Sequence, residues 1–477
     1  MNFPVFHLDG LGNPILVALI AVIHVLINHP LAVGIAPLIV GLEWWGYRTG
    51  VKTWDELAYR VLFVIFIITT TFGAMTGVGI WFSTSLVNPD AIGSLIRVFF
   101  WGWFAEWIIF VAEVVLILAY FMTWRRWTQR TEPFAINLGP AGVLRVKPKL
   151  AHIWLGVALA VFSWGTMAVI VGILGFMMDS GQWVTDHGFF SGFFNPLYFP
   201  QLAFRTCCAL MGAGLVVLAL IPFFTRRDDP VRRRAIRVVS LWVGYWLIWT
   251  LGAGLLYWYM IPRSMVGNLA VALTTQDFTD WHEAVLATLL IAVGVIAAVA
   301  AWGAIRPRWL PRVALVVPMI LAMGLLGSFE RVREFIRKPW VIQNYLYSNG
   351  LRVEDYPLYQ QEGLLAHATY TTTPIVTEDN KLEAGRNVFT LACTRCHTVD
   401  GTFSVRWRLT RLYGEEEPWN PEEIASFIVG MHNVRPFMPP FPGSDAERDA
   451  LAVYLSSLQD PAAARREFVL HHGEVSR

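Results

Sequence analysis

Apolar stretches that alternate with short polar segments fill the first 340 residues of the chain. A helix needs roughly 20 apolar residues to cross about 30 Å of hydrocarbon. Stretches of at least this length lie near residues 14–44, 57–83, 95–123, 151–177, 200–224, 237–262, 281–303 and 311–336. The pattern therefore predicts a bundle of about eight transmembrane helices.

Lysine and arginine are concentrated in every second loop between these stretches. The alternate loops 84–94 and 178–199 contain no lysine or arginine, and the loop 263–280 contains only Arg263. Because cytoplasmic loops carry the excess of these residues, the N-terminus is predicted to lie outside the cytoplasm. With an even number of spans, the C-terminus is predicted to lie outside as well.

The apolar pattern ends near residue 340. Residues 341–379 contain tyrosines, prolines and scattered charges, which are typical of an extended connector. Residues 380–477 include two stretches, 380–391 and 445–458, that predict helices. We expect an all-α protein with a membrane bundle at 1–340, an extracytoplasmic connector at 341–379 and a small helical domain at 380–477.

The composition supports a membrane protein. Of 477 residues, 55% are hydrophobic and 15% are charged, and the mean hydropathy is +0.49, which is too apolar for an ordinary soluble enzyme. The net charge of +2 is spread over loops, so we expect no nucleic-acid partner. Four cysteines are too few for a disulfide framework. No charged segment with a cleavage site precedes the first apolar stretch, so we expect no removable signal peptide.

The pentad Cys393-Thr394-Arg395-Cys396-His397 has the spacing of a c-type haem attachment site. Its two thiols can bond covalently to the haem edge, and the adjacent imidazole can bind the iron. We predict one covalent haem c, attached through Cys393 and Cys396, with His397 as an iron ligand.

Met438 is the predicted second ligand of this iron. It lies in Phe437-Met438-Pro439-Pro440, where the prolines hold a loop that can bring a thioether to the distal face. Met431 and His432 are alternatives at the end of a predicted helix. With a helix before the pentad and another near the end of the chain, this region resembles a class I cytochrome c domain.

Ionisable side chains inside the predicted spans are costly to bury and mark candidate functional positions. His24 and His29 lie in the first span, and either is a candidate iron ligand or a hydrogen-bonded core histidine. Glu106 and Glu113 lie seven residues apart in the third span, on one helix face. The two glutamates predict a proton path, and the alternative is that each is paired with a buried donor.

The eighth span ends in Glu334-Phe335-Ile336-Arg337-Lys338-Pro339-Trp340. This sequence places a carboxylate near the outer interface, followed by two cations on the side that otherwise lacks them. Haem propionates would be suitable anionic partners for Arg337 and Lys338. Snorkelling of the two side chains to lipid headgroups is the alternative.

The membrane part, about 340 residues, resembles subunit I of the cytochrome bd type oxygen reductases. In that family a haem-ligating histidine shortly precedes Pro-Leu-x-x-Gly. Here His24 precedes Pro30-Leu31-Ala32-Val33-Gly34, one residue further away than usual, which makes His29 a rival. In the family's third helix, the second of two functional glutamates is followed eleven residues later by tryptophan. Glu113 and Trp124 keep that spacing, and the glutamate at position 106 approximates the first.

The family's Glu-x-Gly-Arg-Gln-Pro-Trp sequence corresponds to residues 334–340, with isoleucine and lysine in place of glycine and glutamine. The resemblance implies that Glu334 is an axial ligand of a high-spin haem. It also implies that Arg337, Lys338 and Trp340 help to bind that haem.

Other positions depart from the family. Its low-spin haem b uses a histidine a few residues after Asn-Pro in the fifth span, whereas Asn195-Pro196 is followed by Arg205 at that place. We keep Arg205 as a candidate cofactor-binding residue. The partner methionine has no clear counterpart, and His187 and His282 are outer-side substitutes. The long quinol-binding loop and a ninth helix are missing. His152 lies where the family also has a histidine, and we assign it no ligand role.

These departures fit a chain that no longer takes electrons from quinol, as in the divergent, cytochrome c-bearing relatives of bd oxidases. We predict a subunit of a terminal oxygen reductase in the inner membrane, which receives electrons through its haem c on the periplasmic side. Protons would come from the cytoplasm past Glu113 and Glu106. The alternatives are a non-catalytic haem relay in a larger respiratory complex and a quinol:cytochrome c oxidoreductase.

The resemblance also implies cofactors and partners. It implies haem b in the bundle and allows haem d, with His24 and Glu334 as the two ligands. It implies a second membrane subunit, besides membrane lipid and a periplasmic electron donor or acceptor.

Overall fold

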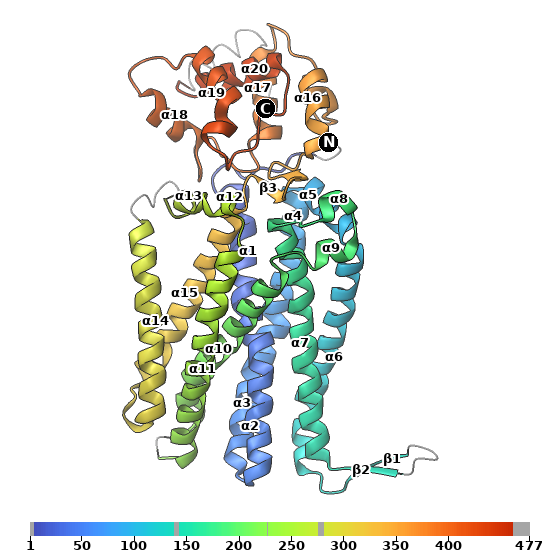
Figure 1. Cartoon of the computed structure of the whole chain (residues 1–477), viewed down its shortest axis with the longest axis vertical. Coiled ribbons are helices and arrows are strands. Elements are labelled where there is room, and N and C mark those ends of the chain that lie inside the picture. The colour runs from blue at the N-terminus through green and yellow to red at the C-terminus, as the bar shows by residue number, and fades with distance from the viewer. Residues whose placement is uncertain (1–3, 138–142, 227, 275–280, 461–477) are drawn as a thin grey trace, which may run out of the picture.

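The computed structural model describes residues 4–137, 143–226, 228–274 and 281–460. Figure 1 shows a tall bundle of long helices with a small helical domain on one end. The end that carries this domain is called the upper end below, and the opposite end of the bundle is called the lower end.

Each of the first two spans is a long helix interrupted by a wider π-helical turn. Pro30 cannot donate the usual backbone hydrogen bond, and the first π turn lies around it. This turn packs closely on α10 (Tyr198–Phe224), because a β-carbon on Gly34 would lie 1.9 Å from the carbonyl oxygen of Ala209. The first span consists of α1 (Asn13–Ile27), η1 (Asn28–Gly34) and α2 (Ile35–Thr49), and the second of α3 (Lys52–Ile68), η2 (Thr69–Gly73) and α4 (Ala74–Val87).

Further long helices complete the bundle. At the lower end an antiparallel hairpin, with Phe134 opposite Val146, joins the third span to the fourth. The long helices are α6 (Phe100–Gln129), α7 (Pro148–Met178), α10, α11 (Pro230–Met260), α14 (Trp281–Ile305) and α15 (Arg312–Ile336). The shorter elements are α5 (Pro89–Val98), β1 (Phe134–Asn137), β2 (Val143–Val146), α8 (Trp183–Asp186), α9 (Phe189–Phe193), α12 (Arg263–Val266), α13 (Leu269–Thr274) and η4 (Pro307–Trp309).

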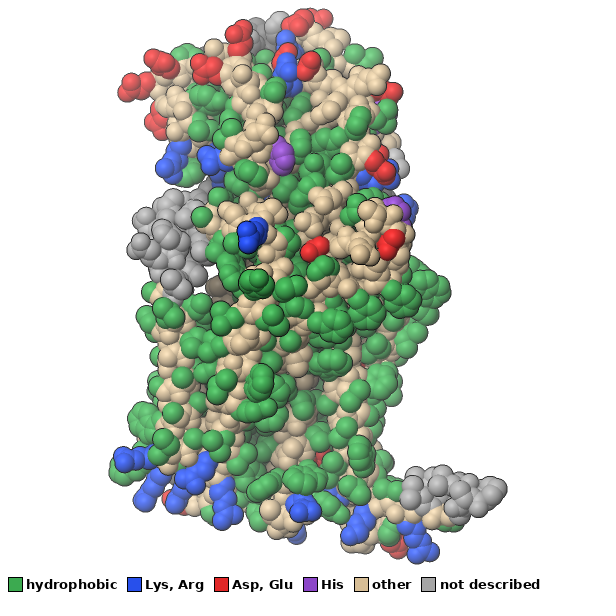
Figure 2. Space-filling view, viewed as in Figure 1, with side chains coloured by type: hydrophobic (Ala, Val, Ile, Leu, Met, Phe, Trp, Pro, Cys, Tyr) green, Lys and Arg blue, Asp and Glu red, His purple; other side chains and the backbone are tan. Residues whose placement is uncertain are grey.

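Eight helices among the described residues are long and apolar enough to cross a membrane, which confirms the predicted number. Figure 2 shows an apolar surface around the middle of the bundle, with lysine and arginine gathered at the lower end. The chain is therefore a multi-pass membrane protein whose cation-rich loops share one end.

The fifth span, α10, lies at the centre of the bundle. It contacts α2, α7, α11, α15 and η1, and Ala209, Ala213 and Val217 on it are fully buried. Small side chains let helix backbones approach closely, and such packing drives helix association in lipid. Most of α10 therefore faces protein rather than lipid, and this places Arg205 inside the bundle.

The described part of the upper domain, which ends at residue 460, consists of four helices around an apolar core. Its first and last helices cross closely, because a β-carbon on Gly385 would lie 2.0 Å from the carbonyl oxygen of Ala450. The four helices are α17 (Lys381–Ala392), α18 (Val405–Tyr413), α19 (Pro421–Val434) and α20 (Asp445–Ser457). Between α15 and this domain lie β3 (Trp340–Ile342), β4 (Leu346–Tyr347), η5 (Val353–Asp355), α16 (Tyr356–Glu362) and η6 (Leu365–His367).

Glu447 ties η6 to the upper domain. Its buried carboxylate accepts hydrogen bonds from the backbone N–H groups of Leu364 at 2.8 Å, Leu365 at 2.7 Å and Ser444 at 2.9 Å. The Ser444 hydroxyl accepts a bond from the N–H of Glu447 in return, which completes a capping box. One carboxylate thus starts α20 and also holds the chain that arrives from the membrane.

Replacing Glu447 with alanine should lower the free energy of unfolding of the upper domain by roughly 3 kcal/mol, because buried N–H groups lose their acceptor. Limited proteolysis of the full chain in detergent should then cut residues 363–380 faster than in the wild type. Glu423→Ala, which removes an exposed carboxylate from α19, is the matched control. Equal cutting of the two variants would contradict the role assigned to Glu447.

Candidate haem sites

His397 lies in the turn after α17. Its Nδ1 lies 3.1 Å from the backbone carbonyl oxygen of Phe403 and donates a hydrogen bond to it, because a carbonyl can only accept. Nε2 is then the ring nitrogen that can bind iron. Burial, together with the nearby Arg408, lowers the pKa of His397 to about 4. The imidazole is therefore neutral, which is the form that coordinates a metal.

The two cysteines of the pentad lie where the upper domain meets the bundle. Cys393 packs against the apolar core of the domain. The Sγ atom of Cys396 accepts a hydrogen bond from Nζ of Lys338 at 3.1 Å. Both thiols are free, so both are available for thioether bonds. These residues and the orientation of His397 fit a covalently bound haem c.

Met438 lies in the loop between α19 and α20. Its backbone N–H donates to the carbonyl oxygen of Arg435 at 2.8 Å. Its own carbonyl oxygen accepts a bond from Nδ1 of His432 at 2.5 Å. His432 therefore holds the Met438 loop through its backbone, and this bond occupies one ring nitrogen. Met438 as the second iron ligand stays a prediction.

The pentad and the Met438 loop both contact the membrane bundle. The guanidinium of Arg395 donates a hydrogen bond to the backbone carbonyl of Val87, at the end of α4. The ring of Phe437, next to Met438, lies 5.7 Å from the ring of Phe335 on α15, measured between centroids. Residues suited to hold haem c therefore rest on the upper ends of α4 and α15.

The upper part of α15 carries acidic and basic side chains that pair along one helix face. Arg333 donates through Nε to Glu330 at 3.1 Å. Glu334 lies 3.6 Å from Nη2 of Arg333 and forms a close ion pair with Arg337. Arg337 also donates to the carbonyl oxygen of Val341 at 2.7 Å. Glu330 and Arg333 were not predicted as site residues from the sequence, although each lies four residues before one member of the predicted Glu334–Arg337 pair.

Glu334 has surroundings that suit a haem-binding carboxylate. Its side chain is 49% exposed, whereas those of Arg333 and Arg337 are buried. Within the described part of the chain, Nη1 of Arg333 and Nε of Arg337 have no hydrogen-bond partner. Buried guanidinium donors without an acceptor are costly, and propionate groups would satisfy them. The residues present fit a haem bound by Glu334 and the two arginines.

Arg205 joins three elements inside the bundle. Its Nη2 pairs with Oε1 of Glu330 at 2.7 Å, and its Nη1 donates to Nε2 of His29 at 2.9 Å. None of the three residues is more than 7% exposed. A buried arginine needs a compensating anion, and Glu330 supplies it. Arg205 is the residue that the resemblance aligns with a low-spin haem ligand, and here its side chain is paired with Glu330.

His24 and His29 differ in their partners. Nδ1 of His24 lies 3.1 Å from the hydroxyl of Thr76, and its Nε2 accepts from the amide of Asn28 at 3.1 Å. A neutral amide is displaced by a metal more easily than the charged Arg205 that bonds His29. His24 lies one residue further from Pro30 than the resemblance expects. The π turn that begins at Asn28 contains an additional residue per turn, which accommodates this longer spacing. We therefore keep His24 as the candidate ligand.

Glu113 lies between α6 and α7. Its carboxylate accepts bonds from the hydroxyls of Ser163 at 2.6 Å and Thr166 at 3.1 Å. Glu106 lies two turns closer to the upper end on the same face of α6. Glu113 is thus paired with donors, as the alternative interpretation expects, and these hydroxyls are also groups that can relay a proton.

The remaining candidate residues have other surroundings. Trp340 stacks on Tyr347 with ring centroids 4.4 Å apart, so it packs within the β3–β4 segment. Arg337 and Lys338 both face protein partners. His187 is exposed at the end of α8, away from the buried polar groups of the bundle. The side chain of His282 lies outside the described residues.

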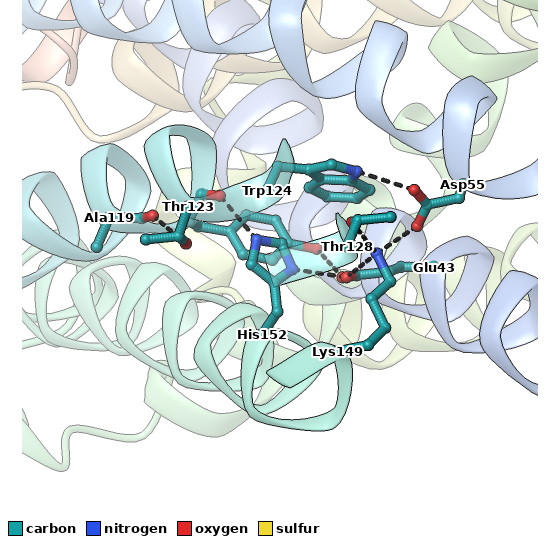
Figure 3. A network of polar contacts seen from close by, with 9 residues as sticks. Glu43, Asp55, Ala119, Thr123, Trp124, Thr128, Lys149 and His152 are labelled. Atoms are coloured by element: carbon teal, nitrogen blue, oxygen red, sulfur yellow. Dashed lines mark hydrogen bonds and ion pairs between the residues drawn. The ribbon is translucent and has the colours of Figure 1, made fainter. Parts of the chain in front are cut away.

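A polar cluster at the lower end was not predicted from the sequence. Glu43 is fully buried; its carboxylate accepts from the Tyr120 hydroxyl at 2.6 Å and lies 2.6 Å from Nδ1 of His152 and 2.7 Å from Nζ of Lys149. Figure 3 shows Lys149 between Glu43 and Asp55. A lysine and a histidine three residues apart at the start of a span were the available signal, but their acidic partners come from other helices.

Comparisons with known proteins agree with the two-part architecture. Residues 380–455 match the family described as cytochrome c oxidase, cbb3-type, subunit III. The solved structure of the bd oxidase from Geobacillus thermodenitrificans is similar with a TM-score of 0.56 at 16% identity, covering 70% of this chain and 89% of that chain. The membrane bundle has the bd oxidase fold. No curated protein matches the chain. A cytochrome c domain implies haem c, so the bd-like bundle and this domain together form a membrane electron-transfer protein.

Replacing Cys393 and Cys396 together with alanine should abolish covalent haem staining of the denatured chain, because no thioether bond can form. Haem staining after denaturing electrophoresis measures this loss. The matched control replaces Cys207 and Cys208, the two thiols inside α10, and should keep the stain. A stain that persists without the two pentad cysteines would refute the attachment site.

Replacing Met438 with histidine should lower the midpoint potential of haem c substantially, because thioether ligation raises the potential relative to two imidazoles. A spectroelectrochemical titration of the full chain measures the midpoint. Met431→His is the control and should leave the midpoint near the wild-type value. If the control shifts the midpoint and Met438→His does not, Met431 takes the ligand role.

Proposed function

We propose that this chain is the haem-carrying subunit of a bd-like terminal oxygen reductase that receives electrons through its own haem c instead of from quinol. The observation that carries the proposal is the contact between the haem c pentad and the end of α15. Lys338 bonds Cys396 at 3.1 Å, four residues after Glu334, the proposed axial ligand. Electrons would therefore cross a short distance from the upper domain into the bundle.

Several contacts support a fixed position of the upper domain. Arg395 bonds the end of α4, and Phe437 packs on α15. The backbone N–H of Thr402 donates to the carbonyl oxygen of Gly10 at 3.2 Å. The two chain segments are so close at this point that a β-carbon on Gly401 would lie 2.2 Å from the carbonyl oxygen of Gly10. Movement of the upper domain away from the bundle would break all of these contacts. Electron transfer from haem c without movement of the domain is therefore favoured.

The surroundings of Arg205 support a route of electrons that does not start from quinol. Arg205, paired with Glu330, stands where the resemblance expects a ligand of a low-spin haem, and such a haem would accept electrons from quinol. The segment between α11 and α14 spans only residues 261–280, of which the described part forms α12 and α13. The segment is too short for the long quinol-binding loop of the family that the membrane part resembles, and the Arg205–Glu330 pair offers no ligand for the haem beside that loop.

We propose haem b in the bundle, with haem d at one of its sites, held through His24 and Glu334. When bound, the high-spin haems would supply the iron at which oxygen is reduced. The cation-rich lower end would face the cytoplasm, and the haem c domain would face the periplasm. Glu113 and Glu106 would move protons upward. A second membrane subunit and a periplasmic electron donor would complete the assembly.

A non-catalytic haem relay is the second candidate function. It is favoured by the close pairing of Glu334 with Arg337 and Arg333. In a relay subunit the carboxylate would stay with the arginines and bind no iron. The haem content of a Glu334 variant separates the two functions.

Replacing Glu334 with alanine should remove one high-spin haem from the purified protein and leave haem c in place. Arg337→Ala should retain that haem and lower its midpoint potential, because a nearby positive charge stabilises the reduced form. Haem extraction and redox titration measure the two effects. Glu354→Ala, which removes an exposed carboxylate, is the control.

In the wild-type protein prepared in the same way, reduced cytochrome c should reduce the membrane haems, whereas quinol should not. A full haem complement in Glu334→Ala would contradict the ligand assignment. Rapid reduction of the bundle by quinol alone would contradict the route through haem c.

A further inference from the structure

The polar cluster at the lower end of the bundle forms one connected network of Glu43, Asp55, Tyr120, Lys149 and His152 (Figure 3). We propose that this network is a proton-loading site, which takes up one proton at the cation-rich end and passes it toward the interior of the bundle. The inference rests on the proposed function, because reduction of oxygen consumes protons.

Both ring nitrogens of His152 lie next to oxygen atoms. Nε2 is 2.9 Å from the backbone carbonyl oxygen of Tyr120, and Nδ1 is 2.6 Å from Oε1 of Glu43. The carbonyl can only accept, so Nε2 carries the hydrogen, and a neutral imidazole has no second one. The contact at 2.6 Å therefore requires an additional proton on Nδ1 or on Oε1. The His152–Glu43 pair holds one proton more than an imidazole and a carboxylate.

Charge balance explains why this proton is retained. With it, the network contains two anions, Glu43 and Asp55, and two cations, Lys149 and His152. Without it, the network carries a net negative charge around side chains that are fully buried. An unbalanced charge in such surroundings is costly. The pair therefore gives up this proton only to a group whose proton affinity has risen, as happens to groups above the network when an electron arrives near them.

The network reaches from the protein surface to the interior. The side chains of Lys149 and Asp55 are 15% and 18% exposed, whereas those of Glu43 and His152 are not exposed. Lys149 bonds both carboxylates, so the contacts are continuous from the lower surface to His152. Trp124 donates to Asp55 at 3.2 Å and fixes its orientation. A proton from water can therefore reach the buried pair without crossing an apolar layer.

The third and fourth spans lead from the network to the proposed proton path. Tyr120 and Glu113 lie on one face of α6, about 10 Å apart along the helix axis. The Tyr120 hydroxyl bonds Glu43, and Glu113 is bonded from α7 by Ser163. Leu116 on α6 and Leu159 on α7, which lie at intermediate positions of these helices, belong to the apolar core. Transfer across this interval would use water molecules, so the interval can act as the gate.

The transfer changes no oxidation state in the network. One proton leaves water at the lower surface and is held between Nδ1 of His152 and Oε1 of Glu43. One proton then leaves upward toward Glu113, which leaves a neutral imidazole and a carboxylate, and a second proton from water at the lower surface reloads the pair. The full sequence therefore adds one proton to the chain. The groups that set its charge come from every element packed around it: Glu43 on α2, Asp55 on α3, Tyr120 on α6, and Lys149 and His152 on α7.

The test measures proton uptake when the purified full-length chain with its haems is reduced anaerobically. A viologen radical is a suitable donor because it carries no proton and needs no quinol site, and a dye in lightly buffered solution reports the pH. Glu43→Gln and His152→Gln should each take up one proton fewer per chain than the wild type, across the pH range in which the wild type takes it up. Glu132→Gln, which removes an exposed carboxylate near the lower end, is the matched control and should match the wild type.

Infrared spectroscopy of the same chains gives a second measurement that does not depend on haem reduction. The wild type should show a protonated carboxyl or imidazolium band that Glu43→Gln and His152→Gln lack and that Glu132→Gln retains. Wild-type proton uptake in Glu43→Gln with its full haem complement, or absence of the band from the wild type, would overturn the proposal. If the wild-type chain shows the band but binds no membrane haem, the proposed function is refuted. The inference that the His152–Glu43 pair holds a proton would still stand in that case.

Discussion

The ion pair between Arg205 and Glu330 is the interaction on which the centre of the bundle depends. Neither charge is stable alone in hydrocarbon, so α10 and α15 are held together by the need of each charge for the other. His29 adds η1 to the same contact. From Glu330 the charges continue through Arg333 and Glu334 to the upper interface, where the chain meets the haem c pentad. One constraint therefore positions the proposed haem ligand Glu334 and also pairs Arg205, the residue that the resemblance aligns with a low-spin haem ligand.

The polar groups of the bundle fall into separate sets along its long axis. The upper set contains arginines with unsatisfied buried donors, which suits anionic cofactor groups and transfer of electrons from above. The lower set is a network that balances its charge by holding a proton. Glu113 lies between the sets, on α6, with donors on α7. This separation suits a membrane reaction in which electrons and protons arrive from opposite sides.

The upper domain is bonded to the two chain segments that connect it with the bundle. Glu447 joins η6 of the connector to α20, and the segment around Gly10, just before α1, lies against the chain after the pentad. These bonds leave the pentad little freedom to move away from α15. The fusion of the two parts in one chain therefore also fixes their distance, which governs how readily an electron crosses.

The amino-acid sequence by itself determined the local features. A long apolar stretch in hydrocarbon must satisfy its backbone N–H and C=O groups internally, and a membrane-spanning helix does this with local hydrogen bonds. The haem c pentad consists of five consecutive residues, so it can be recognised without knowledge of a distant partner. Tertiary structure decided which buried polar groups meet. α6 is apolar on nearly all sides, so its sequence does not show which face turns toward α7. Arg205 could be seen as a departure, but its partner Glu330 lies 125 positions further along the chain. The lower network draws residues from four helices, and only the rotation and packing of those helices bring them together.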